Sequence, residues 1–161
     1  MKNKNIRFAV QAATIAALYT ALTLLANLFG LANYAIQVRF SEALTILPCF
    51  TPAAVSGLFL GCLLSNILTG ALPLDIVFGS VATLLGAIFT RLLRKYKVLA
   101  PLPPIISNTL IIPFVLAFVY NFEGSIWYFA LTVGLGEIIS CGALGYLLMS
   151  AMKRFPKNIF E

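Results

Sequence analysis

The stretch FAVQAATIAALYTALTLLANLF, residues 8–29, contains no charged side chain. A helix needs about 20 predominantly apolar residues to cross the hydrocarbon layer of a membrane, and this stretch is long enough. Further apolar stretches follow it, so we interpret it as a mature helix and not as a cleaved signal peptide. The stretch therefore predicts that the chain enters a membrane near its N-terminus.

The composition extends this prediction to the whole chain. The 161 residues are 61% hydrophobic and 10% charged, and the mean hydropathy is +0.99. Soluble domains are roughly a quarter charged, and disordered chains are poorer in apolar residues, so both classes are excluded. About six crossings would fill the chain. If the protein uses ATP, a partner must therefore supply the ATPase.

Proline, glycine and polar residues divide the chain into six expected helices. The second is the shortest, carries Arg39 and Glu42, and is closed by Pro48 and Pro52. We expect Asp75 to be the N-cap of the fourth helix and Pro113 to kink the fifth. The expected ranges are Phe8–Phe29, Ala35–Phe50, Pro52–Thr69, Asp75–Arg91, Pro101–Tyr120 and Ser125–Met152.

The positive charges indicate the orientation. The net charge is +6, from eleven basic and five acidic residues, with no histidine. Basic residues cluster near the N-terminus, between the fourth and fifth helices, and near the C-terminus, as in cytoplasmic loops, and not as in a nucleic-acid-binding surface. We expect an all-α integral membrane protein: one transmembrane domain, residues 1–161, with six helices in one bundle and both termini cytoplasmic. The clusters comprise Lys2, Lys4 and Arg7; Arg91, Arg94, Lys95 and Lys97; and Lys153, Arg154 and Lys157.

The few polar groups at membrane depth are candidates for function, because each must face a partner or a cavity. Each also has a simpler interpretation. Glu137 is either functional or a hydrogen-bonded structural acid, and Arg39 and Glu42 are either ligands or an ion pair with each other. Asn66 and Asn108 could simply join two helices, and Asp75 could be only a helix cap.

Depth along the helices places most of these groups in one half of the bundle. Arg39, Glu42, Asn66 and Asp75 are expected in the outer half, with Glu137 below them. We predict that they form one polar pocket that opens outward and takes a small ligand rich in N–H donors. Trp127, Tyr128 and Phe129 could offer a flat aromatic face, or could simply belong to the aromatic belt at the membrane boundary.

The first helix carries alanines at every fourth position: Ala9, Ala13, Ala17 and Ala21. Small residues at this spacing let another helix approach closely within lipid. We expect this face to dock a partner, although internal packing would use the same pattern. The chain has no histidine and no P-loop, GxSxG or HExxH motif. We therefore expect no enzyme activity, cofactor or metal site.

Three motifs resemble the QueT family. They are QVRFSEALT at residues 37–45, DIVFGSVATL at residues 75–84, and Gly136-Glu137, and the resemblance extends over essentially the whole chain. Members of this family are substrate-binding (S) components of energy-coupling factor (ECF) transporters, which are ABC importers. The resemblance implies a bacterial plasma membrane protein, surrounded by lipid, that captures a queuosine precursor outside the cell for ATP-driven uptake.

The resemblance also implies the partners and the ligand. The partners would be a transmembrane coupling (T) protein and two ABC ATPase subunits, with the alanine-rich first helix as the docking surface. The ligand would be a 7-deazaguanine such as preQ0, preQ1 or queuine, whose adjacent N–H donors a carboxylate can accept in pairs. Two alternatives stay open: an S component for a riboflavin-, thiamin- or biotin-like vitamin, and a self-contained proton-coupled carrier that uses Glu137 as a relay.

Overall fold

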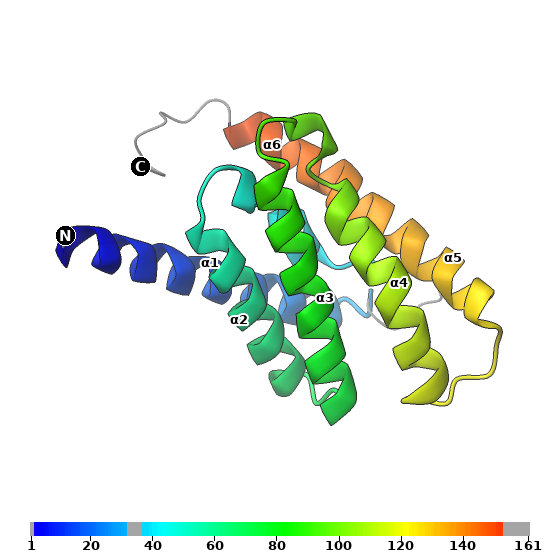
Figure 1. The fold of residues 1–161 in the computed structure, drawn as a ribbon. Helices are drawn as coiled ribbons and strands as arrows, with labels where there is room; N and C mark the ends of the chain where they lie inside the picture. The colour runs from blue at the N-terminus through cyan, green and yellow to red at the C-terminus, as the bar shows by residue number, and fades with distance from the viewer. Residues whose placement is uncertain (1, 32–36, 153–161) are drawn as a thin grey trace.

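The computed structural model describes residues 2–31 and 37–152, and all regular structure in these ranges is helical (Figure 1). A 3₁₀ segment, η1, follows α1, and a π-helical segment, η3, joins α5 to α6 in one continuous rod. The elements are α1 (Lys2–Leu28), η1 (Phe40–Cys49), α2 (Ala53–Leu68), α3 (Pro73–Leu92), η2 (Lys97–Leu99), α4 (Leu102–Phe118), α5 (Ile126–Glu137), η3 (Ile138–Leu144) and α6 (Gly145–Met152).

Four helical stretches are long and apolar enough to cross a membrane: Asn3–Leu28, Pro73–Leu92, Lys97–Phe118 and Ile126–Met152. Large apolar side chains are exposed along them, including Leu110 at 63% and Phe118 at 69%. A surface of this kind suits lipid and not water. The protein is therefore a multi-pass membrane protein. The expected total of six crossings stays a prediction, because η1 and α2 are shorter.

The expected second helix, Ala35–Phe50, differs most from the structure. Ala35 and Ile36 lie outside the described residues, and the helix that follows is a ten-residue 3₁₀ helix, Phe40–Cys49. Pro48 supplies a physical reason, because in an α-helix its ring would clash with the carbonyl group four residues earlier. Eight of the ten residues of η1 are buried, so this short segment lies inside the bundle.

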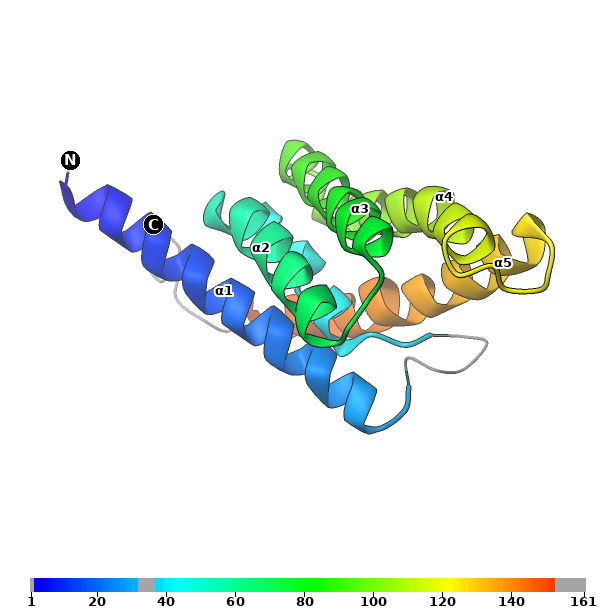
Figure 2. The same cartoon turned by 90° about the horizontal axis from the view of Figure 1, so that it is seen from below.

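Small residues set the close packing of α1 on α2 (Figure 2). A Cβ atom at Gly57 would lie 2.8 Å from the carbonyl oxygen of Ala12, and one at Gly61 would lie 2.7 Å from the Cβ of Tyr19. Any larger residue at these positions would push the two helices apart. The glycine pattern on α2 is thus used for packing within the bundle, while the first turns of α1 extend beyond it (Figure 1).

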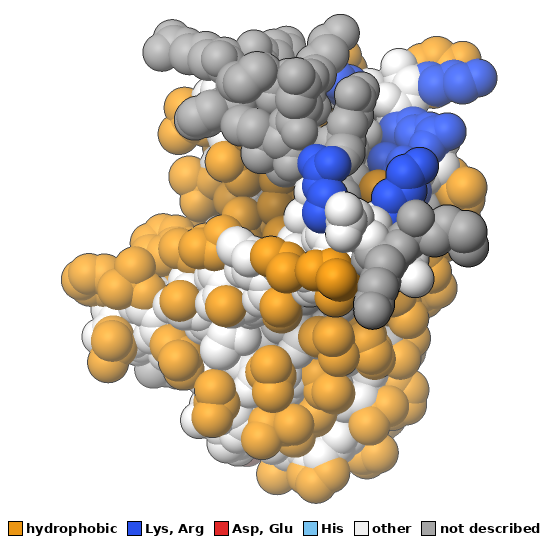
Figure 3. Space-filling view, turned by 90° about the vertical axis from the view of Figure 1, so that its left-hand side faces the viewer, with side chains coloured by type: hydrophobic (Ala, Val, Ile, Leu, Met, Phe, Trp, Pro, Cys, Tyr) orange, Lys and Arg blue, Asp and Glu red, His pale blue; other side chains and the backbone are white. Residues whose placement is uncertain are grey.

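The basic side chains gather in the upper part of the face drawn in Figure 3, whereas the lower part is mainly hydrophobic. In Figure 1 the connection between α3 and α4 and the end of α6 lie at the same end of the molecule. Arg91 of the α3–α4 cluster also ties η1 down, since its Nη1 donates to the carbonyl oxygen of Pro48 at 3.0 Å. The cluster at Lys153, Arg154 and Lys157 lies outside the described residues.

Candidate functional site

A cavity of about 320 Å³ lies among α1, the segment before η1, and the adjoining ends of α2, α3 and α4. Small-molecule sites in proteins begin at about this volume. Three of the predicted site residues, Arg39, Asn66 and Asp75, line it together although they come from three separate parts of the chain. The other polar lining groups include Asn27, Gln37 and Tyr120.

The sequence predicts Asp75 as the N-cap of its helix, and this prediction is wrong. The N-cap of α3 is Leu72, and Pro73 occupies the first helical position, where a missing N–H is harmless. Asp75 consequently lies in the first turn, where the helix dipole favours a negative charge. Its carboxylate lines the cavity and accepts a hydrogen bond from the hydroxyl of Tyr120 at 2.8 Å.

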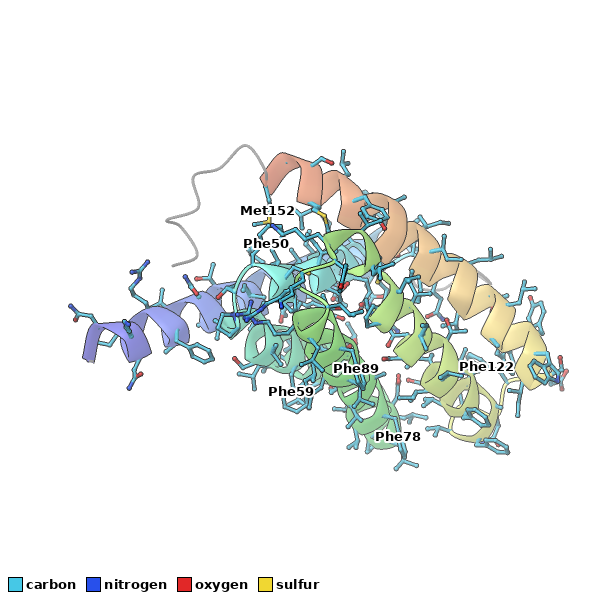
Figure 4. The ribbon with its side chains drawn as sticks, turned by 45° about the horizontal axis from the view of Figure 1, so that its top comes forward. Phe50, Phe59, Phe78, Phe89, Phe122 and Met152 are labelled. Atoms are coloured by element: carbon cyan, nitrogen blue, oxygen red, sulfur yellow. The ribbon has the colours of Figure 1, made fainter. Side chains whose placement is uncertain are left out.

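Two aromatic rings, Tyr120 and Phe122, form one wall of the cavity. Asn121 between them has a φ of +51°, a left-handed conformation that asparagine tolerates well. The chain thereby folds back, and the N–H of Phe122 bonds to the carbonyl oxygen of Leu116 at 3.2 Å. The two rings stack with their centroids 5.6 Å apart. Figure 4 places Phe122 beyond the end of α4.

The protonation of Tyr120 suits a hydrogen-bond donor. Burial, followed by the hydrogen bond to Asp75, raises the pKa of the Tyr120 phenol above its usual value. The hydroxyl is protonated at neutral pH and donates its hydrogen bond to the Asp75 carboxylate.

The predicted aromatic face at Trp127 is not part of this cavity. The Trp127 side chain is 84% exposed on the first turn of α5. Its neighbour Tyr128 is also exposed. Their positions match the alternative interpretation of an aromatic belt at the membrane boundary.

A second, narrow pocket adjoins the cavity and leads to Glu137. It is lined by Gln37, Arg39 and Ile112, which also line the cavity, together with Val133 and Glu137. The segment that carries Gln37 and Arg39 presses against α5, and a Cβ atom at Gly136 would overlap the carbonyl oxygen of Gln37. The N–H of Arg39 donates to the Oγ of Ser140 at 3.1 Å. This segment thus separates the cavity from the interior.

Behind the segment lies an acid cluster, Glu42, Glu137 and Cys141, whose ligating atoms all lie within 4.8 Å of one another. Glu42 is 1% exposed and Glu137 is 8% exposed. The hydroxyl of Tyr19 donates to Glu42, and the thiol of Cys141 donates to Glu137 at 3.0 Å. By chemical type the three groups could hold a cation, but at present they hydrogen-bond within the protein.

The π-helical turn of η3 begins directly after Glu137 and contains Ser140 and Cys141. Such turns often occur at functional sites, because they change the direction of side chains within a helix. In this molecule the turn directs the side chain of Ser140 toward the backbone of Arg39 and that of Cys141 toward Glu137.

The remaining predicted residues connect these regions. Asn108 is 4% exposed and interacts with the side chain of Glu137, so it belongs to the acid cluster and not to the cavity lining. Arg39 lines both pockets, and its charge acts on both Glu42 and Asp75. It is therefore the electrostatic link between the cavity and the acid cluster.

Sequence reasoning missed several residues of this region, among them Tyr19, Gln37, Tyr120 and Cys141. Gln37 stands in the QVRFSEALT motif and could have been found there. Tyr19 and Cys141 lie in apolar stretches where nothing in the local pattern distinguishes them from packing residues. Tyr120 resembles a boundary aromatic, and nothing in the local sequence indicates that its hydroxyl reaches Asp75.

The alanine stripe of α1 faces outward. Ala9, Ala13, Ala17 and Ala21 are all exposed, whereas Ala12 and Ala16, on the neighbouring face, are buried against α2. Small residues on one face of the helix therefore pack against α2, whereas those on the other face lie on the surface of the protein. The stripe remains open to a partner.

Comparison with known proteins places the chain in a family. No curated protein and no solved structure matches it. A family model described as the QueT transporter matches residues 9–154 of the 161. The chain thus belongs to the QueT transporter family, which makes it a transporter protein and not an enzyme.

Proposed function

We propose that the protein is the substrate-capture (S) component of an ECF-type ABC importer. Its ligand would be a queuosine precursor of the 7-deazaguanine class, such as preQ0, preQ1 or queuine. Residues 1–161 would form one domain in a bacterial plasma membrane, with six crossings and both termini cytoplasmic. A transmembrane coupling protein and two ABC ATPase subunits would complete the transporter.

The observation that carries the proposal is the cavity shared by Arg39, Asn66 and Asp75, with Glu137 at its inner side pocket. Its volume of about 320 Å³ suits a small bicyclic ligand. The side chains of Asn66 and Asp75 in its lining offer hydrogen-bond acceptors for the N–H donors of a guanine-like edge. A carboxylate accepts two adjacent N–H donors as a bidentate pair. We assign this task to Asp75 or Glu137.

The aromatic wall supports a flat ligand. The Tyr120 and Phe122 rings lie beside Asp75, so a heterocycle stacked on them would present its edge to the carboxylate. Offset stacking adds to the free energy of burial. The aminomethyl cation of preQ1 would in addition find an acceptor in Glu137, at the side pocket.

The outward stripe of α1 supports docking to the coupling protein. Exposed alanines permit a close helix–helix approach, and the printed sequence contains no P-loop motif for ATP. Energy would therefore enter through the docked partners.

The first test identifies the bound molecule. The protein is purified from cells that make queuosine precursors, and the small molecules that it releases on denaturation are identified by mass spectrometry. We expect a 7-deazaguanine in near-stoichiometric amount. Recovery of riboflavin, thiamin or biotin instead would support a vitamin S component and overturn the ligand assignment.

The second test is a substitution in the site that removes the acid and keeps the size of the side chain. Glu137→Gln should weaken preQ1 binding by roughly 100-fold, because a charge-assisted pair of hydrogen bonds in a buried site is lost. Glu123→Gln is the matched control, since Glu123 is exposed outside the site, and it should bind as the wild type does. Equal affinities of the wild type and Glu137→Gln would remove Glu137 from the site.

The proton-coupled carrier is tested in liposomes. The purified protein alone, with a proton gradient and no ATPase, should give no uptake above background. Uptake under these conditions would favour the carrier over the S component.

A further inference from the structure

An apolar groove runs along the outer side of the contact between α3 and α4. Its first lobe, about 490 Å³, lies between one wall formed by Leu85 and Phe89 of α3 and by Leu93 directly after it, and a second wall formed by the first half of α4. Its second lobe, about 560 Å³, lies between Leu74 and Phe78 and the second half of α4. Figure 4 labels Phe89 and Phe78, one in each lobe.

The two lobes form one continuous feature of membrane depth. Leu110 and Ile111 line both of them. From Leu74 to Leu93 the groove follows α3 for about 28 Å at 1.5 Å per residue, close to the ~30 Å thickness of the hydrocarbon layer. Its walls are apolar and open to the outside, so its natural occupant is an acyl chain that runs along the membrane normal.

One end of the groove carries positive charges for which the described part of the chain offers no ion-pair partner. Arg94 and Lys95 follow directly after the lining residue Leu93, and both are exposed. No Asp or Glu lies between residues 76 and 122. The guanidinium of Arg91 is close enough to Arg94 for the two charges to repel each other. An anion at this end would relieve that repulsion.

The other end of the groove differs. Its lobe ends at Leu74 of α3, next to Asp75, and at Phe118 and Val119 of α4. No basic residue lies between residues 98 and 152, so α4 and the loop after it offer no positive charge there. Only the lobe near Arg94 combines an apolar channel with a basic rim.

We propose that the α3–α4 groove is a binding site for an anionic phospholipid, with one acyl chain in the lobe lined by Phe89 and Ile106 and the phosphate of the headgroup at Arg94 and Lys95. Each basic residue near an anionic lipid surface contributes about 1 kcal/mol of attraction. The site is distinct from the polar cavity, and it does not depend on which ligand the protein transports.

The test measures lipid binding to the purified, delipidated protein by native mass spectrometry. Phosphatidylglycerol and phosphatidylcholine with identical acyl chains are compared. We expect the wild type to prefer phosphatidylglycerol. The double variant Arg94→Gln/Lys95→Gln should lose about 30-fold in affinity for it, and little for phosphatidylcholine.

A matched control separates the site from general charge. Lys4→Gln/Arg7→Gln removes the same charge from exposed positions on α1 and should retain the preference for phosphatidylglycerol. An equal loss in this control, or no preference in the wild type, would overturn the proposal.

The acyl-chain lobe is tested separately. Ile106 is 54% exposed in the groove, so Ile106→Trp should fill the lobe and weaken the binding of both lipids. A phosphatidylglycerol with a photoreactive acyl chain gives a second measurement on the unaltered protein, and we expect it to label α3 and α4 around Phe89 and Ile106. Labelling confined to other helices would overturn the assignment.

Discussion

The polar cavity and the outward face of α1 are opposite in character. The cavity brings charged groups together, with Arg39 and Asp75 in its lining and Glu137 in the pocket beside it. The stripe of α1 formed by Ala9, Ala13, Ala17 and Ala21 is exposed and consists of small side chains. The first region can discriminate among ligands by hydrogen bonds, and the second can only permit close contact.

This difference teaches that recognition and docking occupy separate surfaces. A change in the cavity should alter ligand affinity in the isolated protein. A change in the outward alanines should leave that affinity intact and alter only what depends on a partner. Each prediction below tests one side of this separation.

Among the three variants that compare these two surfaces, Asp75→Asn should have the largest effect. It removes the charge that faces the cavity and turns one oxygen into a donor, so the affinity of the isolated protein for preQ1 should fall by about 30-fold. Calorimetric titration gives the dissociation constant, and the thermal midpoint of the unliganded variant shows whether it is folded. A folded Asp75→Asn protein with unchanged affinity would exclude Asp75 from recognition.

The next effect concerns the other surface. Ala13→Leu/Ala17→Leu should reduce uptake in cells by roughly 10-fold, because two enlarged side chains hold a partner helix away. The affinity of the purified variant for ligand should not change. The control is Ala143→Leu, an exposed alanine in η3, which should leave uptake unchanged. If the α1 variant lost ligand affinity instead, the two surfaces would not be separate.

The smallest effect is expected from Tyr120→Phe. The substitution keeps the aromatic wall and removes one hydrogen bond to Asp75, which contributes about 1 kcal/mol, or about a 5-fold change in affinity. Tyr120→Leu, which also removes the ring, should cost more. If both variants lost the same affinity, the ring would contribute nothing to binding.

Helix positions were predictable because apolar length and breakers decide them. The observed α2, Ala53–Leu68, and α4, Leu102–Phe118, agree with the expected ranges to within one or two residues. The start of α3 was placed two residues late, because Asp75 is a good cap in isolation while Pro73 is an equally good first residue. Pro48 indicates a break in η1, but the burial of this segment depends on the helices packed around it, which no local pattern records.

The sequence predicted how deep in the membrane each polar residue lies, but not the direction in which its side chain points. The sequence indicates that Arg39, Asn66 and Asp75 lie in the same half of the bundle, and the structure places them around one cavity. The sequence does not indicate how each helix is rotated about its axis. The positions of Glu42 and Asn108, which lie behind the cavity and beside Glu137, could therefore not be predicted. The aromatic wall depends on the left-handed turn at Asn121, so Trp127 was the more conspicuous candidate although it lies elsewhere.

The most direct measurement is an experimental structure of the protein with preQ1 bound. The account predicts density for a planar bicyclic molecule in the cavity, stacked on Tyr120 and bonded through its edge to Asp75 or Glu137. Density for the ligand in the α3–α4 groove or on the outer surface, with the polar cavity empty, would contradict the account.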